Sequence, residues 1–325
     1  MKKILVTGSN GLLGQKIIYG LLGDPLCLLS NAVRSKIKSE YQIIAAAKGE
    51  NRLNQKTGYT YESLDITNKT DVERVFTTHK PDVIINTAAM TNVDACETKR
   101  EECWAANVTA VKYMTDIAEK IGSHFIHIST DFVFDGMKGT EYDETDKPNP
   151  LHYYAVSKLE GEKVVMNSPP AGRTSKLKWA ILRTIIVYGV VDGNTRSNLV
   201  LWVKNNLDKK QNINVINDQF RAPTLSEDLA YACIMAAING SEGIYHVSGE
   251  KTYNILELAN MIADFWKLDK SYINPVSSEK LNQPAKRPPR TGFIIEKAKK
   301  ALNYNPRTFI DGLKIVEEQL KNRNN

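Results

Sequence analysis

The sequence has little of what marks membrane, secreted or metal-binding proteins. No apolar run reaches about 18 residues, so we expect no transmembrane helix and no membrane partner. Lys2 and Lys3 are followed by an apolar run that is broken at Thr7 and Gly8, and we therefore expect no secretory signal. The four cysteines form no CxxC pair, and neither they nor the five histidines have the spacing of metal ligands. These absences predict a cytoplasmic chain with reduced thiols and no bound metal.

Charge of one sign is not concentrated in any segment. The formal net charge is +6, but lysine and arginine are spread along the chain, which argues against a nucleic-acid partner. A mildly basic protein also suits ligands that carry several phosphates. With 325 residues, 42% of them hydrophobic, the chain can form one large domain or two smaller ones.

What the sequence does contain is a glycine-rich turn close to its start. The apolar run Ile4–Val6 has the composition of a buried strand, and Gly8, Gly11 and Gly14 follow it at intervals of three. Apolar residues at helical spacing come next, over 12–22. Strand, glycine turn and helix in this order predict a cradle for the pyrophosphate of a dinucleotide. The first glycine would allow the turn, the second the approach of the phosphates, and the third close packing of helix on strand.

The rest of the chain alternates strands with helices, which predicts an α/β fold with a doubly wound parallel Rossmann sheet. We expect residues 1–188 to form the dinucleotide-binding domain with the catalytic residues. Residues 189–325 would form a smaller, mainly substrate-binding domain, with some segments returning to the Rossmann sheet. The predicted strands are 42–47, 59–65, 82–89, 124–129, 179–188, 213–216 and 243–248, and the predicted helices are 71–78, 97–120, 152–160, 198–206, 225–238, 255–266, 293–302 and 310–320.

Two cations follow the predicted second strand, where a bound dinucleotide would place its adenosine ribose. Dinucleotide sites for NAD usually have an acidic residue there, whereas this chain has Lys48 and Arg52. The pair favours a 2′-phosphate and hence NADP. A solvated basic loop is the alternative, and Glu50 between the cations keeps NAD possible.

Hydroxyl, phenol and amine groups then come together as a possible proton-transfer set. Thr130 and Asp131 end the predicted fifth strand, where a hydroxyl can bind a substrate oxygen or simply cap a turn. Tyr154 and Lys158 lie four residues apart, one helical turn, so both side chains leave the same face. A neighbouring ammonium is expected to lower the pKa of the phenol and make it a general acid or base. The alternative is an ordinary solvated helix face.

These segments together resemble the extended short-chain dehydrogenase/reductase family. The resemblance rests on the glycine loop and on single residues near the predicted strand ends, and it covers nearly the whole chain. The segments 129–136, 154–162 and 218–224 with Arg287 are similar to the dTDP-4-dehydrorhamnose reductase branch. The residues of the broader resemblance are Thr7 to Gly14, Asp65, Ile66, Ala88, Ala89, Asn107, Ser129, Thr130, Asp131, Tyr154 and Lys158.

The resemblance implies NADPH-dependent reduction of the 4-keto group of a nucleotide-sugar, dTDP-4-dehydro-L-rhamnose, to dTDP-L-rhamnose, by a possible homodimer. It implies that Tyr154 donates a proton to the sugar C4 oxygen, that Lys158 holds the nicotinamide ribose, and that Thr130 binds the same oxygen. Asp131 would touch the sugar, and Asn107 would support Lys158 through a water. The cofactor contacts implied are Asn10, Gly11 and Leu12 for the pyrophosphate, Asp65 and Ile66 for the adenine, and Ala88, Ala89 and Met90 for the inner part.

Three features depart from the branch's pattern: the predicted substrate residues Ile186 and Arg221, and the segment 24–40. Ile186 stands where members of the branch have a tryptophan beside the sugar, and Arg221 stands where a glycine is usual. Arg221 would meet a diphosphate or face water. Arg287 belongs to the basic segment 280–289, which is either a loop over an anionic ligand or a solvated loop. The segment 24–40, irregular or helical, is a longer insertion than expected.

Two rival functions share this scaffold. One is another nucleotide-sugar enzyme of the family, an epimerase, a dehydratase or a different reductase. A dehydratase would have Glu where this chain has Phe132. Other relatives are regulatory subunits that keep the dinucleotide site without turnover. The presence of Thr130, Tyr154 and Lys158 together argues against that role.

Overall fold

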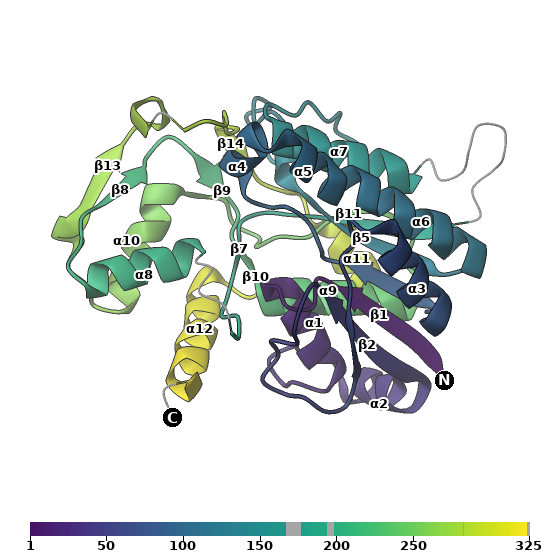
Figure 1. Cartoon of the computed structure of the whole chain (residues 1–325). Coiled ribbons are helices and arrows are strands. Elements are labelled where there is room, and N and C mark those ends of the chain that lie inside the picture. The colour runs from purple at the N-terminus through teal and green to yellow at the C-terminus, as the bar shows by residue number, and fades with distance from the viewer. Residues whose placement is uncertain (167–176, 194–197, 282, 324–325) are drawn as a thin grey trace.

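A parallel sheet of seven strands forms the centre of the computed structural model, which describes residues 1–166, 177–193, 198–281 and 283–323 (Figure 1). The strand order β11-β6-β5-β4-β1-β2-β3 reverses direction beside β1, as in doubly wound nucleotide-binding folds, so the predicted fold class is confirmed. The strands are β1 (Lys2–Thr7), β2 (Tyr41–Ala47), β3 (Thr60–Ser63), β4 (Val83–Asn86), β5 (His124–Thr130), β6 (Lys178–Thr184) and β11 (Gly243–His246).

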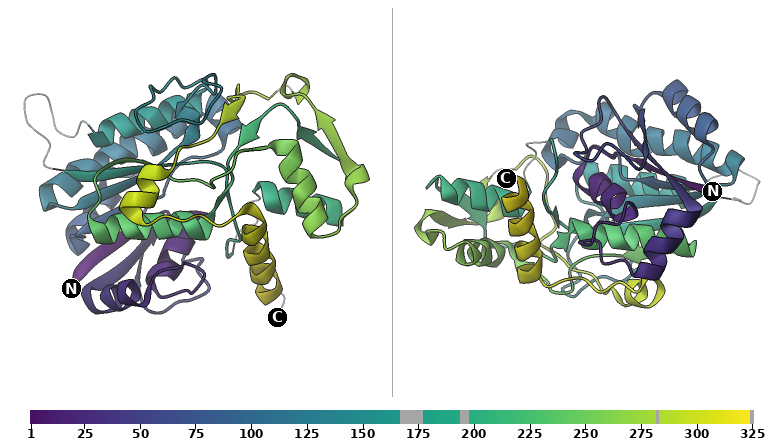
Figure 2. Two further views of the ribbon diagram at one scale, coloured as in Figure 1. Left: turned by 180° about the vertical axis from the view of Figure 1, so that it is seen from behind. Right: turned by 90° about the horizontal axis from the view of Figure 1, so that it is seen from below.

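Helices cover both faces of this sheet, because the buried strands point alternate apolar side chains to opposite sides. Ile4 and Val6 of β1 belong to the core under α1 and α9, whereas Leu5 between them belongs to the core under α3 and α6. The two layers are visible from behind and from below (Figure 2). The helices of the sheet layers are α1 (Leu12–Leu21), α2 (Asn31–Glu40), α3 (Lys69–His79), α6 (Ala110–Ile121), α7 (Tyr153–Met166), α9 (Ser226–Asn239) and α11 (Glu296–Leu302).

Two predicted elements are interrupted in the structure. The helix predicted over 97–120 is divided into α4 (Val93–Thr98), α5 (Arg100–Trp104), a π-helical turn over 105–109 and α6. The strand predicted over 179–188 is divided into β6 and β7 (Val187–Tyr188) because Ile186 has a φ of 30°, which extended backbone does not allow. Both interruptions lie beside the candidate site.

A second core lies beside the sheet, in the lobe at the left of Figure 1. It is formed by α8 (Leu199–Asp208), α10 (Ile255–Phe265) and α12 (Phe309–Arg323), with β8 (Ile213–Ile216) paired to β13 (Ile273–Val276). Short strands join the lobe to the sheet: β9 (Phe220–Arg221), β10 (Thr224–Leu225), β12 (Tyr253–Asn254) and β14 (Arg290–Thr291). Among the described residues, no helix has the length and apolar composition needed to cross a bilayer.

A buried ion pair ties three helices together. Lys16 of α1 contacts Glu227 of α9 at 3.0 Å, and the two side chains are only 7% and 2% exposed. Gln319 of α12 donates to the same carboxylate at 2.6 Å. Burial alone would raise the pKa of Glu227, but Lys16 and Gln319 lower it overall, so the carboxylate stays ionised. The pair therefore connects the sheet layer to the second core.

Replacing Lys16 tests this connection. We expect Lys16→Met to lower the free energy of unfolding by about 3 kcal/mol, because Glu227 is left buried without its counter-charge. The double variant Lys16→Met/Glu227→Gln should recover most of the loss. Lys69→Met, which removes a lysine that is 65% exposed, should cost less than about 0.5 kcal/mol. Urea denaturation of the four proteins measures these differences, and equal losses for Lys16→Met and Lys69→Met would contradict the structural role of the pair.

Candidate active site

A cavity of about 900 Å³ lies where the sheet strands end at their carboxyl edge. This edge is where open α/β sheets bind ligands. A second cavity, of about 710 Å³, lies beside α2 and contains none of the predicted site residues. The predicted residues that line the larger cavity are Gly8, Asn10, Gly11, Leu12, Gly14, Lys48, Arg52, Asp65, Ile66, Ala88, Ala89, Met90, Thr130, Asp131, Tyr154, Lys158 and Ile186.

The glycine loop approaches its neighbours so closely that two positions have no room for a side chain. Gly8 has a φ of 71°, and a Cβ on it would lie 2.8 Å from the backbone nitrogen of Ala88. A Cβ on Gly14 would lie 2.3 Å from the carbonyl oxygen of Gly8. Helix α1 begins after Gly11 without a side-chain cap and without an acidic residue in its first turn. Its first N–H groups can therefore bind an anion such as a pyrophosphate.

At the far end of the cavity, the two predicted cations differ in their surroundings. Lys48 is 79% exposed and pairs with Asp65 at 2.6 Å, so its charge is partly neutralised. Arg52 is exposed, and its backbone N–H donates to the Asn10 side chain at 2.9 Å. Among the described residues, no hydrogen bond or ion pair engages the Arg52 guanidinium. Arg52 is therefore the cation with its charge available to a ligand at this end.

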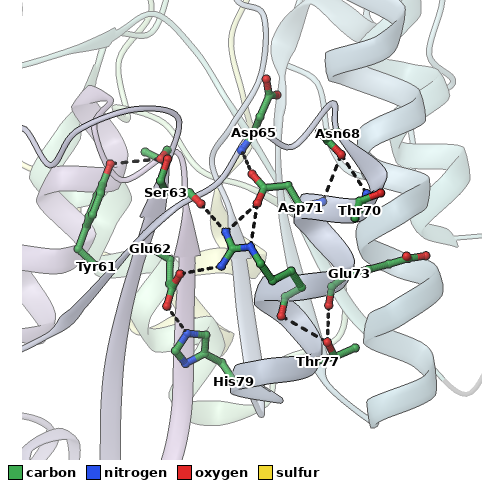
Figure 3. A network of polar contacts seen from close by, with 12 residues as sticks. Tyr61, Glu62, Ser63, Asp65, Asn68, Thr70, Asp71, Glu73, Thr77 and His79 are labelled. Atoms are coloured by element: carbon green, nitrogen blue, oxygen red, sulfur yellow. Dashed lines mark hydrogen bonds and ion pairs between the residues drawn. The ribbon is translucent and has the colours of Figure 1, made fainter.

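A surface network holds the loop that carries Asp65 (Figure 3). The Asp65 N–H donates to Asp71 Oδ2 at 2.7 Å, and Asp71 also pairs with Arg74. Arg74 reaches Glu62 of β3 at 3.2 Å, and Glu62 accepts from His79 at 2.8 Å. These contacts join β3 to α3 and place Asp65 at the cavity wall.

Tyr154 and Lys158 lie in the first turns of α7, and both are buried at the cavity wall. Burial is the main reason that the pKa of Tyr154 is raised, and the Asp131 carboxylate raises it further, while a hydrogen bond with Thr130 opposes the rise. The prediction that Lys158 lowers the pKa of this phenol is therefore wrong for the ligand-free chain. The Lys158 ammonium is engaged elsewhere, by the Ile128 carbonyl at 2.7 Å. A phenol that stays protonated is suited to donate a proton.

Thr130 caps a turn and also lies at the cavity wall, and its contact with a substrate oxygen stays a prediction. Its hydroxyl accepts from the N–H of Phe132 at 3.2 Å and so caps the short turn after β5, and it also lines the cavity. The hydroxyl donates to Asp131 Oδ1 at 3.0 Å. The Asp131 carboxylate is 2% exposed and also accepts from Thr291. Burial raises the pKa of Asp131, although Arg221, Thr291 and Thr130 oppose the rise.

Two predicted substrate residues do not line the cavity. Arg221 is 1% exposed, so the alternative that it faces water is wrong. Its guanidinium lies 3.8 Å from Asp131 and donates to the carbonyl oxygens of Pro288 and Phe220. Because its hydrogen-bonding groups are used by the protein, the predicted contact with a diphosphate is not supported. Arg287 pairs with Asp94 at 2.8 Å and thereby joins the segment 280–289, of which residue 282 is outside the described residues, to α4.

Asn107 also lies behind the cavity wall. It sits in the π-helical turn, and its amide makes two hydrogen bonds with the backbone of Met90, at 2.9 and 3.0 Å. It donates to Ser157 on α7 at 2.9 Å. The described contacts therefore connect Asn107 to a cavity-lining residue and to α7, and none of them reaches Lys158 directly.

Sequence reasoning missed the part of the cavity wall that comes from the second half of the chain. Val191, Leu199 and Leu229 line it, as does Thr184 at the end of β6. No motif marks these residues, because ordinary apolar spacing describes them equally well. Ile186 is also at the wall, and its positive φ is unusual for a β-branched residue, which is typical of strain at functional sites. In the described chain, no group of His, Cys, Asp and Glu side chains could hold a metal ion.

A parallel Rossmann sheet with a glycine cradle and a Thr–Tyr–Lys set at its carboxyl edge defines a nicotinamide-dependent oxidoreductase of the extended short-chain dehydrogenase/reductase class. Comparison with protein families then identifies the group. The chain belongs to the family described as the RmlD substrate binding domain, whose family model matches residues 1–322.

Individual relatives are similar to this chain over most of their length. The chain is 30% identical to a dTDP-4-dehydrorhamnose reductase from Aggregatibacter actinomycetemcomitans, over 97% of this chain and 98% of that protein. A dTDP-4-dehydrorhamnose reductase from Bacillus anthracis str. Ames, solved in complex with NADP, superposes with a TM-score of 0.78 at 25% identity, covering 98% of this chain and all of that one. Methionine adenosyltransferase 2 subunit beta from Xenopus laevis is 27% identical over 86% of this chain and 76% of that protein.

The buried amine of Lys158 predicts a measurable pH dependence. Burial lowers its pKa to about 8, below the value of about 10.4 in an unfolded chain. Between these values the unfolded chain binds more protons, so Lys158 makes stability rise with pH, by up to about 1.4 kcal/mol per pH unit. We expect Lys158→Met to abolish this rise between pH 8 and 10 in denaturation experiments. Lys163→Met, on the exposed side of the same helix, should keep the wild-type slope, and an unchanged slope in Lys158→Met would contradict the assignment.

Proposed function

We propose that this protein reduces the 4-keto group of a nucleotide-sugar with NADPH, and that the substrate is dTDP-4-dehydro-L-rhamnose. One observation carries the proposal: a buried, protonated Tyr154 lies with Thr130 and Lys158 at the wall of a cavity that begins at a glycine cradle. The reductases among the relatives, one of them solved with NADP, support the choice of substrate and cofactor.

The residues present fit a nicotinamide dinucleotide. The backbone of the Gly8–Gly14 loop and the uncapped start of α1 would hold its pyrophosphate, and Lys158 would hold its nicotinamide ribose. When bound, the cofactor supplies the hydride that adds to C4 of the sugar. The phenol of Tyr154 donates its proton to the C4 oxygen as negative charge develops there. The hydroxyl of Thr130, which donates to Asp131 in the ligand-free chain, would turn its hydrogen to the same oxygen and orient the carbonyl.

The charge of Lys158 assists the proton transfer. Its pKa of about 8 leaves the amine largely protonated at pH 7. A phenolate forms on Tyr154 when the proton leaves, and a nearby ammonium lowers the free energy of that anion. The high pKa of the phenol in the ligand-free chain keeps it protonated until the substrate oxygen becomes basic.

A regulatory subunit is the second candidate, because one relative is named as a subunit of another enzyme. The catalytic set argues against it, since a chain that only binds a dinucleotide has no use for a proton donor at the cavity wall. The dehydratase alternative keeps the objection that Phe132 stands in place of the acidic residue. The homodimer and the cytoplasmic location stay predictions.

The proposal is tested by following NADPH oxidation with dTDP-4-dehydro-L-rhamnose and then with a panel of other 4-keto nucleotide-sugars. We expect turnover to be fastest with the rhamnose precursor. Tyr154→Phe should lose at least about 100-fold in kcat while still binding NADPH, because the proton donor is gone. Tyr153→Phe, one residue earlier in α7, is the matched control and should keep wild-type turnover. No turnover with any keto-sugar would favour the regulatory subunit, and an active Tyr154→Phe would contradict the proton donor.

The adenosine end of the cavity predicts which cation selects the cofactor. We expect Arg52→Ala to raise the KM for NADPH about tenfold and that for NADH less than about twofold, because a 2′-phosphate would lose its ionic partner. Lys48→Ala should change the NADPH value less than about threefold, since Asp65 already neutralises this lysine. Steady-state kinetics with both cofactors measures the ratios, and a larger effect of Lys48→Ala would reverse the assignment.

A further inference from the structure

A row of four buried polar side chains crosses the sheet and ends at Lys158. Thr7, Asn86 and His127 lie side by side because β1, β4 and β5 are paired in the register Thr7–Asn86 and Asn86–His127. Thr7 Oγ1 lies 2.6 Å from Asn86 Oδ1, and Asn86 Nδ2 lies 3.1 Å from His127 Nδ1. The other ring nitrogen of His127 lies 3.3 Å from Lys158 Nζ. All four side chains are at most 3% exposed.

The core around this row is mostly apolar, and the buried Arg183–Glu162 ion pair lies further along the same sheet face. His127 stacks beside Phe125, and the surrounding core includes Leu5 and Ile84. Buried polar groups at such a place lower stability unless each one finds a partner. Apolar side chains of similar size would stabilise this core more than the polar row does. We therefore look for the role of the row at Lys158, where it ends.

The hydrogen bonds of Lys158 determine the protonation state and tautomer of His127. The Lys158 ammonium has three N–H groups and no acceptor. One N–H reaches the carbonyl of Ile128 at 2.7 Å, and a second reaches His127 Nε2, which must then be unprotonated. Burial, with the charge of Lys158, holds the pKa of His127 well below its usual value, so the ring is neutral. The ring hydrogen is therefore on Nδ1.

The proton on Nδ1 also fixes the amide of Asn86. An Nδ1–H can only donate, so this tautomer requires the Asn86 amide to be flipped relative to the structure, in which Nδ2 faces the ring and Oδ1 faces Thr7. The flipped amide presents its oxygen to the ring and its NH2 group to Thr7. The opposite tautomer would set the Nε2–H of His127 against the ammonium, two donors 3.3 Å apart. The hydroxyl of Thr7 accepts from the amide and completes the row.

We propose that His127 is a positioning residue for Lys158, and this inference rests on the proposed reductase function. The ring nitrogen of His127 and the carbonyl of Ile128 take two of the three ammonium hydrogens. The third N–H is then left for the cavity that Lys158 lines, where a ribose hydroxyl of a bound dinucleotide would accept it. Asn86 and Thr7 hold the tautomer that makes this possible.

The other charged or titratable groups near Lys158 do not supply this contact. Glu162 follows one turn later on α7, but both of its oxygens are used by Arg183, at 2.9 and 2.7 Å. Cys103 of α5 is buried, and its sulfur lies 3.2 Å from Ser157 Oγ. Among the described residues, Ile128 and His127 are the two that lie within hydrogen-bond distance of Lys158 Nζ.

The first experiment needs neither cofactor nor substrate. Nitrogen-15 NMR of the imidazoles in the intact, ligand-free protein reports the tautomer of His127, which His127→Gln assigns by loss of its signals. We expect a neutral Nδ1–H ring from pH 6 to 8. An Nε2–H ring or a protonated ring in this range would overturn the proposal, whatever the fate of the proposed function.

The second experiment is kinetic, with NADPH and dTDP-4-dehydro-L-rhamnose. We expect His127→Phe to lower kcat/KM about tenfold, because the ammonium loses one acceptor. The charged amine is then less stable, so the alkaline limb of the kcat/KM profile should move to lower pH by roughly 0.5–1 unit. His127→Gln, which can still present an oxygen to the amine, should recover most of the activity and of the profile.

His124 provides the matched control, since it is buried on the same strand and contacts Ser241 instead of Lys158. His124→Phe should leave the pH profile unchanged. An unshifted profile in His127→Phe, or equal losses in the two phenylalanine variants, would show a packing role only and overturn the proposal. If His127→Phe does not fold, the NMR result and the pH profile of His127→Gln decide between the outcomes. A wild-type chain without turnover would contradict the proposed function, and the tautomer measurement would still decide the positioning role.

Discussion

The register of the parallel strands is the constraint on which the rest of the site depends. Because β1, β4 and β5 are aligned residue by residue, their carboxyl ends meet at one edge of the sheet. The glycine loop, the backbone after β4 and Thr130 therefore reach the same cavity from three separate segments of the chain. A shift of one residue between two strands would turn every side chain of the shifted strand to the opposite face.

The second constraint is the burial of the titratable side chains at this edge. Tyr154, Lys158 and Asp131 are all buried, and each has a pKa displaced in the direction of its neutral form. For the phenol this displacement serves the proposed chemistry, because the group stays a proton donor. The amine, with a pKa of about 8, keeps most of its charge at pH 7 in spite of the displacement. For Asp131 the surrounding hydrogen bonds and Arg221 limit the rise, so the carboxylate organises Thr130 and the strands around it.

Arg221 illustrates how a departure from a family pattern can change the meaning of a residue. A cation near a predicted anion site suggests a ligand contact when only the sequence is known. In the fold the guanidinium packs over Phe132 and donates to the carbonyl oxygens of Pro288 and Pro289. It links β9, the segment before β14 and the end of β5, so its role is to hold the second lobe against the sheet.

The sequence by itself determined the sheet, the glycine cradle and the Tyr154–Lys158 pair, because each depends on short-range spacing: alternation along a strand, glycines at a turn, and four residues along a helix. The tertiary structure decided how the groups are charged and which of them meet. The burial that raises the pKa of Tyr154, the pairing of Lys48 with Asp65 and the row from Thr7 to Lys158 all join residues distant in the chain. Desolvation and pairing across elements depend on the three-dimensional surroundings of a group, and no local pattern encodes those surroundings.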